Sequence, residues 1–249
     1  MQYGLTFIDD EDLFNHVKST VEKYRAIICL RDFRKNIIDP IKLTFDARIY
    51  QQSWEEIIEG EVIRQLDKSN NNHIGYFHQD IFHYIDGWHV PSQGFDVINQ
   101  SKKIYVEMKN KHNTMNSSSS QKTYMKMQDQ LIEDAESVCL LVEVIAKRSQ
   151  NIPWKISLNS VSKSRDNIRR VSIDQFYRLA TGQNDAFYQI CQVLPRVIND
   201  VLESTNLDSI IQNTVIEELM EGRTDVDILK SIYQTSFATY EGFTDFKWR

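Results

Sequence analysis

Apolar residues recur at helical spacing near both ends of the chain. Residues 9–28 follow this pattern, and Asp10 or Asp12 is placed to cap a helix there. The same pattern returns after Ile173 and continues to the C-terminus, where it predicts four further helices. The first fifty residues and the last quarter of the chain are therefore expected to be mostly helical.

A second strong helical signal covers residues 51–69. Ser53 precedes Glu56 by three residues, which is the spacing of a capping box at the start of a helix. The polar stretch at residues 70–75 is expected to end this helix, and the aromatic-rich residues 76–85 predict a short helix after it.

Two strand-like segments follow, at residues 95–100 and 103–109. A polar turn at Ser101 and Lys102 separates them, so they are expected to form a hairpin. Residues 137–146 form a nearly continuous apolar run rich in β-branched side chains, as expected for a central strand covered on both faces.

The intervening segments complete the order of elements. Residues 110–121 predict a polar loop, residues 122–136 a helix, residues 154–158 a strand and residues 159–172 a basic loop. This order predicts an α/β fold with a mixed central sheet flanked by helices and a largely helical C-terminal portion.

The sequence shows no linker, so residues 1–249 are expected to form a single domain. Its core would cover about residues 50–160, between helical portions at residues 1–49 and 173–249.

Composition excludes some classes of protein and leaves others open. The chain has 249 residues, of which 41% are hydrophobic and 26% charged, as in ordinary globular domains. No signal peptide or membrane-length apolar run is evident, and the three cysteines are widely separated, which predicts reduced thiols in a cytoplasmic protein.

Charge is unevenly distributed along the chain. The net charge is −6, yet thirteen Lys and Arg face seven Asp and Glu between residues 102 and 170. A basic middle suits a nucleic-acid partner, although the same imbalance also fits an ordinary solvated surface.

The candidate chemistry lies on the predicted hairpin. Side chains two residues apart in a strand share a face, so Glu107 and Lys109 point the same way. The hairpin folds Asp96 back toward Glu107, so two carboxylates and a lysine converge. Such a pair of carboxylates suits Mg²⁺, and the lysine suits a water or a phosphate. The alternative is cross-strand ion pairing on a solvated sheet face.

A third acidic residue falls on the apolar side of the helix predicted at residues 51–69. Glu61 lies between Trp54 and Ile57 on the helical wheel, and a carboxylate on a buried face is costly unless it is paired. Glu61 is therefore a candidate for a further catalytic or metal-site residue, with Glu59 as the alternative, and a partly exposed edge position would explain it equally.

These residues resemble a known group of nucleases. Asp96, the triplet Glu107-Met108-Lys109, the preceding acidic helix and the following helix and strand resemble the PD-(D/E)XK nuclease superfamily. Within it, the stretches "HIGYFHQDIF", "GWHVP", "GFDVIN" and "YVEMKNKHNTMNSSSS" are similar to type II restriction endonucleases that cut GGNCC or GGWCC sites. The proline that usually precedes the aspartate is Phe95 here, and that proline is not a ligand.

The resemblance implies a Mg²⁺-dependent enzyme that cuts double-stranded DNA at a short symmetric site. Asp96 and Glu107 would bind the metal, and Lys109 would be the catalytic lysine. The enzyme would act as a homodimer, and a cognate DNA methyltransferase would protect the host DNA.

DNA contacts are expected from two polar segments, because Arg, Lys, Asn and Gln side chains bind phosphates and base edges. The candidates are Lys111, His112, Asn113 and Asn116 in the first segment and Lys163, Arg165, Arg169 and Arg170 in the second. Two other functions remain open, a DNA repair or junction-resolving nuclease and a non-catalytic DNA-binding module on the same fold.

Overall fold

The computed structural model describes most of the chain and divides it into two compact units. The described ranges are residues 2–24, 27–112, 114–158, 161–205 and 212–220. Unit 1 consists of residues 1–23 and 73–207, and unit 2 consists of residues 24–72 and 208–249. The helices expected after residue 220 lie outside the described residues.

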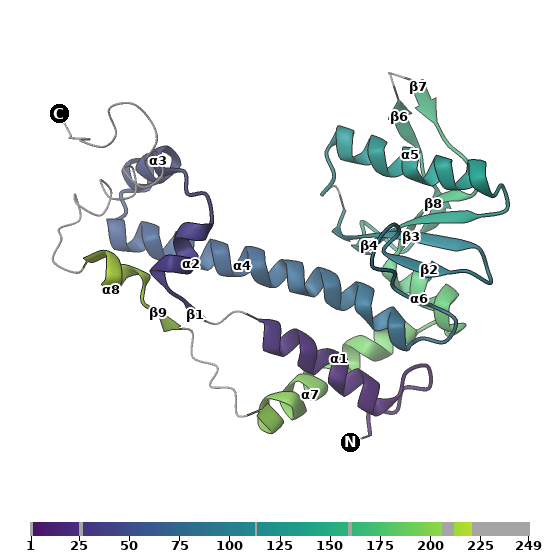
Figure 1. Ribbon diagram of the computed structural model, residues 1–249, viewed down its shortest axis with the longest axis horizontal. Coiled ribbons are helices and arrows are strands. Elements are labelled where there is room, and N and C mark those ends of the chain that lie inside the picture. The colour runs from purple at the N-terminus through teal and green to yellow at the C-terminus, as the bar shows by residue number, and fades with distance from the viewer. Residues whose placement is uncertain (1, 25–26, 113, 159–160, 206–211, 221–249) are drawn as a thin grey trace. The chain divides into compact units, whose positions relative to one another are not determined.

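A five-stranded mixed sheet forms the centre of unit 1 (Figure 1). Its strands, in spatial order, are β2 (Val97–Asn99), β3 (Ile104–Lys111), β4 (Val138–Ile145), β8 (Ile168–Ser172) and β5 (Asn151–Pro153). The two outer pairs are antiparallel, whereas β3, β4 and β8 run parallel. The predicted α/β class with a mixed central sheet is confirmed.

Helices cover both faces of this sheet. The elements on one side are α1 (Asp10–Lys23), the 3₁₀ helix η1 (Ile81–Tyr84), α6 (Ile173–Thr181) and α7 (Ala186–Thr205). Their apolar side chains pack with Val106, Met108 and Val142 of the sheet. On the other side lies α5 (Ser117–Glu133), whose Tyr124 and Met127 are fully buried. The central strand is therefore apolar on both faces, as its sequence predicts.

A small two-stranded hairpin accompanies the α5 side of unit 1. It consists of β6 (Ile156–Leu158) and β7 (Val161–Lys163), which extend beyond α5 in Figure 1. Trp154 precedes the hairpin and is buried against Tyr124, with ring centres 5.4 Å apart. The base of the hairpin is therefore anchored in the core, whereas the side chains of β7 are exposed.

Unit 2 has a separate small core. Its described elements are β1 (Ile27–Ile28), α2 (Leu30–Lys35), α3 (Pro40–Tyr50), the first part of α4 (Trp54–Asp80), β9 (Gln212–Asn213) and α8 (Val215–Met220). β1 pairs with β9 in parallel. Phe33, Leu43, Ile58 and Val215 are among its buried residues.

Helix α4 begins as predicted but continues much further. The Ser53 hydroxyl accepts a hydrogen bond from the Glu56 amide at 3.3 Å, and the Glu56 carboxylate accepts one from the Ser53 amide at 2.9 Å, so the capping box is confirmed. The predicted break at residues 70–75 is wrong, because α4 runs on to Asp80. Asparagine residues lower the stability of a helix only slightly, and a long helix can accommodate the larger cost of a single glycine such as Gly75.

Three other element predictions need correction. The first helix ends at Lys23, and residues 27–28 form β1. α5 begins inside the predicted polar loop, where the Asn116 side chain caps it by accepting a hydrogen bond from the Ser119 amide at 2.8 Å. The predicted basic loop at residues 159–172 contains β7 and β8, because Ile168 and Val171 are buried beside β4.

Candidate active site

The β2–β3 hairpin brings two carboxylates together. Val97 pairs with Val106, and the Asp96 amide donates to the Val106 carbonyl at 2.9 Å, so Asp96 lies at the end of the ladder beside Glu107. One Asp96 carboxylate oxygen accepts a hydrogen bond from the Met108 amide at 2.7 Å. This bond fixes the Asp96 side chain against the strand that carries Glu107.

Alternation along β3 separates the site from the core. Val106 and Met108 point into the apolar core, whereas Glu107 and Lys109 occupy the opposite face. The Lys109 Nζ lies 3.7 Å from a Glu107 carboxylate oxygen. Asp96, Glu107 and Lys109 are thus brought together, as the sequence predicts.

Burial sets the electrostatics of this group. Glu107 is 8% exposed. Burial, reinforced by the Glu107 charge, raises the pKa of Asp96, while the hydrogen bond from the Met108 amide opposes this rise. Two converging carboxylates in partial burial form an anionic site that favours a cation.

A second lysine, which the sequence did not single out, also contacts Glu107. Lys126, on α5, forms an ion pair with the Glu107 carboxylate. Its ammonium also donates to the Gly94 carbonyl at 2.7 Å and lies 4.4 Å from the centre of the Phe95 ring. No spacing rule connects Lys126 with the hairpin, because the contact depends on how α5 docks on the sheet.

A buried charged cluster lies next to Lys109 on the same face of the sheet. Glu143, on β4, pairs in register with Lys109 and is only 1% exposed. Its carboxylate accepts a hydrogen bond from Arg170 at 2.5 Å and contacts His112 Nδ1 at 3.0 Å. This cluster of Glu143, Arg170 and His112 was also missed, although a glutamate inside the apolar run at residues 137–146 was a usable signal.

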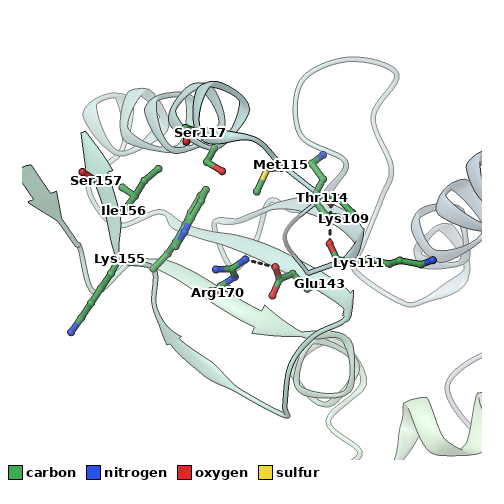
Figure 2. Close-up of a pocket in the computed structure, with 12 residues that line it drawn as sticks. Lys109, Lys111, Thr114, Met115, Ser117, Glu143, Lys155, Ile156, Ser157 and Arg170 are labelled. Atoms are coloured by element: carbon green, nitrogen blue, oxygen red, sulfur yellow. Dashed lines mark hydrogen bonds and ion pairs between the residues drawn. The ribbon is translucent and has the colours of Figure 1, made fainter. Parts of the chain in front are cut away.

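The cluster borders a pocket of about 280 Å³ (Figure 2). Its walls come from β3, the start of α5, β4, β8 and the segment Trp154–Ser157. In Figure 2 Arg170 and Glu143 face each other, whereas Lys155 extends away from them. The pocket thus joins the strand that carries Lys109 to the base of the β6–β7 hairpin.

The predicted DNA contacts fall into different environments. Lys111, Asn116, Lys163 and Arg165 are exposed, whereas Asn113 lies outside the described residues. His112 and Arg170 contact Glu143, as described above. Arg169 binds Asn151 through its guanidinium, at 2.5 Å to the side chain and 2.7 Å to the carbonyl. The residues of the second basic segment therefore differ: Lys163 and Arg165 are exposed, whereas Arg169 and Arg170 form hydrogen bonds within unit 1.

Glu61 belongs to unit 2 and is 7% exposed, so the expectation of a buried-side glutamate is confirmed. Arg64 binds both of its carboxylate oxygens, at 2.6 and 2.5 Å, and Gln65 donates to one of them at 3.0 Å. This pairing satisfies the buried charge within unit 2. Glu59 is exposed.

Comparisons with known proteins identify the class of enzyme. Residues 5–203 match the family model described as Eco47II restriction endonuclease. The type II restriction enzyme Sau96I from Staphylococcus aureus is 30% identical over 213 residues, which cover 80% of this chain and 82% of that protein. The type II restriction enzyme Eco47II from Escherichia coli is 32% identical over 212 residues, covering 80% of this chain and 88% of that protein.

The class is therefore a type II site-specific deoxyribonuclease that acts on double-stranded DNA. More particularly, the chain belongs to the Eco47II restriction endonuclease family. Among the three functions that the sequence left open, the comparisons support the restriction enzyme. Within the described residues, no helix combines the length and the apolar character that a membrane span requires.

Proposed function

We propose that Asp96, Glu107 and Lys109 form a Mg²⁺-dependent phosphodiesterase centre of the PD-(D/E)XK type. The observation that carries this proposal is the register of the β2–β3 hairpin, which places the Asp96 and Glu107 carboxylates side by side, with the Lys109 ammonium 3.7 Å from Glu107. Enzymes of this class generally use a divalent metal ion.

The donor set fits Mg²⁺ better than a more demanding metal. Among the described residues, no group of three or more His, Cys, Asp or Glu is arranged to hold a metal ion. Mg²⁺ needs only one or two protein carboxylates, because waters and substrate phosphate oxygens supply the remaining ligands. Asp96 and Glu107 meet this requirement.

Each residue then has a separate role at the scissile phosphate. The bound Mg²⁺ would supply Lewis-acid stabilisation of the phosphate and acidify a water. Asp96 and Glu107 would hold the ion, and the Met108 amide would keep Asp96 oriented. Lys109 would orient the attacking water or stabilise the charge that develops on the phosphate oxygens. Glu61 stays a candidate for a further acidic group.

DNA binding is proposed for the exposed cationic and amide groups of unit 1. Lys111 and Asn116 border the catalytic strand and the start of α5, and Lys163 and Arg165 lie on or just after β7. A two-stranded β-ribbon fits the major groove of DNA, which suits the β6–β7 hairpin as a DNA-contacting element. Arg169, Arg170 and His112 would act indirectly, by fixing the sheet beneath these groups.

The proposed target is a short symmetric site, GGNCC or GGWCC. One chain carries one Asp96, Glu107 and Lys109 group, so cutting both strands of a symmetric site calls for two copies related by a two-fold axis. We therefore propose a homodimer, accompanied by a DNA methyltransferase that modifies the same site in the host.

The decisive experiment is end mapping on a fully sequenced plasmid, with Mg²⁺ and with EDTA. We expect discrete Mg²⁺-dependent ends that share one symmetric motif. Glu107→Gln should reduce cleavage by on the order of a thousandfold, because several kcal/mol of charge stabilisation depend on the metal, yet it should still bind the mapped duplex. Glu133→Gln, an exposed carboxylate on α5, is the matched control. Wild-type cleavage by Glu107→Gln would overturn the site assignment.

A further inference from the structure

Two ammonium groups contact one carboxylate, that of Glu107, in the candidate active site. Lys109 lies 3.7 Å from one oxygen of Glu107, and Lys126 forms an ion pair with the other. Lys109 belongs to the same strand as Glu107, whereas Lys126 comes from α5, nineteen residues further along the chain. The Glu107 side chain is 10% exposed and the Lys126 side chain 36% exposed, so this second ion pair is shielded from water on one side.

The Lys126 ammonium contacts the carboxylate that is proposed to hold the metal ion. Mg²⁺ would coordinate carboxylate oxygens directly, and Lys126 contacts one of the two Glu107 oxygens that could serve as a ligand. The four charged groups, Asp96, Glu107, Lys109 and Lys126, sum to zero. A divalent ion added to this set, with Lys126 still at the Glu107 oxygen, would meet strong repulsion at short range.

The Lys126 ammonium has other contacts that it could keep with little movement if it left Glu107. Its ammonium already donates to the Gly94 carbonyl at 2.7 Å and lies 4.4 Å from the centre of the Phe95 ring. A lysine side chain is long and flexible, and the face of an aromatic ring attracts a cation. Lys126 can therefore release Glu107 and keep two of its three contacts.

We propose that Lys126 is a displaceable counter-ion that sets the metal affinity of the enzyme before DNA binds. This inference rests on the proposed function, because it takes Glu107 as a metal ligand. Lys126 holds the Glu107 carboxylate in place while no metal is bound and gives up that oxygen when the metal enters. It acts through Glu107, so it is a positioning residue.

The test measures metal binding directly, in the absence of DNA and of turnover. Mn²⁺ binding to the full chain is followed by electron paramagnetic resonance or by calorimetry. Lys126→Met should bind Mn²⁺ about tenfold more tightly than the wild type, since a charge-assisted contact no longer has to be broken. Lys126→Arg, which keeps the charge, should stay within about threefold of the wild type on the same scale. Lys122→Met, an exposed lysine on the same helix, should leave the affinity unchanged.

A second readout comes from the dependence of cleavage on Mg²⁺ concentration. The Mg²⁺ concentration for half-maximal cleavage should fall for Lys126→Met and stay unchanged for Lys122→Met. A purely structural role of Lys126 would lower the maximal rate without moving this midpoint downward. Thermal unfolding of each variant verifies that it is folded. If Lys126→Met is unfolded, Lys126→Arg is used for the test in its place.

The outcomes separate this inference from the proposed function. Unchanged or weaker Mn²⁺ binding by folded Lys126→Met, while Glu107→Gln abolishes binding, overturns the role of Lys126 and leaves the metal site standing. If Lys126→Met does not fold, loss of the wild-type affinity in Lys126→Arg overturns it. Wild-type Mn²⁺ binding by Glu107→Gln overturns the metal site itself.

Discussion

Removing the buried charge of Glu143 is expected to destabilise unit 1 strongly. The Glu143 side chain is 1% exposed, and its carboxylate contacts Arg170 at 2.5 Å and His112 at 3.0 Å. In Glu143→Gln the Arg170 guanidinium, which is 22% exposed, would lose its counter-charge. Breaking one partner of a buried ion pair costs about 3–5 kcal/mol, which is a large part of the stability of an ordinary domain.

The measurement should report on the sheet itself, because the chain has two compact units and a single unfolding transition is not assured. Hydrogen exchange followed by mass spectrometry on peptides from β4 and β8 gives the local free energy of opening. Glu143→Gln should lower it by about 3 kcal/mol or more. Glu22→Gln, which removes an exposed helical ion pair with Lys18, should cost less than about 0.5 kcal/mol.

A double variant isolates the interaction energy. Glu143→Gln and Arg170→Met should each be costly alone, and the two together should cost clearly less than their sum, because neither charge is then left unpaired. A cost below about 1 kcal/mol for Glu143→Gln, similar to that of Glu22→Gln, would refute the view that this cluster is desolvated and electrostatically coupled.

Three further predictions concern stability. Burial lowers the pKa of His16 and of His78 to about 4 from 6.5, so folding opposes their protonation. The stability of the folded protein should be retained above pH 6.5 and lost as the pH falls toward 4, by about 2 kcal/mol for each ring at pH 5. A free energy of unfolding in urea that is the same at pH 7 and pH 5 would contradict this. Ser53→Ala removes the cap of α4 and should cost about 1 kcal/mol in chemical denaturation, whereas Ser53→Asp should restore most of it. The buried Tyr124 hydroxyl has no hydrogen-bond partner among the described residues, so Tyr124→Phe should leave the unfolding temperature unchanged or raise it, and a clear drop would reveal a partner.

Local patterns were enough to predict the elements that carry the proposed catalytic group. The hairpin follows from two short apolar segments and a polar turn, and alternation alone places Glu107 and Lys109 on one face. The Ser53–Glu56 capping box was equally readable, because both partners lie within one helical turn. In each case the interacting residues are close in sequence or related by a simple period.

The parts that were missed depend on contacts between distant segments. Lys126 reaches Glu107 only because α5 docks on the sheet, and no periodicity connects the two. The charges of Arg169 and Arg170 suggested a solvated loop, whereas pairing with β4 places them in a strand. Helix α4 continues past residue 75 because a cooperative helix outweighs a few weak positions.

The turn between β2 and β3 has a consequence for which sequence changes this family can accept. Asp96 and Glu107 meet only because the turn returns the chain in the register that pairs Val97 with Val106. Adding or removing one residue within β3 would turn the Glu107 side chain toward the core formed by Val106 and Met108, and an apolar side chain would take its place beside Asp96. Extra residues in the exposed turn itself, at Ser101 and Lys102, would leave the ladder intact. Among functional relatives, insertions and deletions should therefore occur at the tip of the hairpin. The number of residues between the paired positions of the two strands and each carboxylate should stay constant.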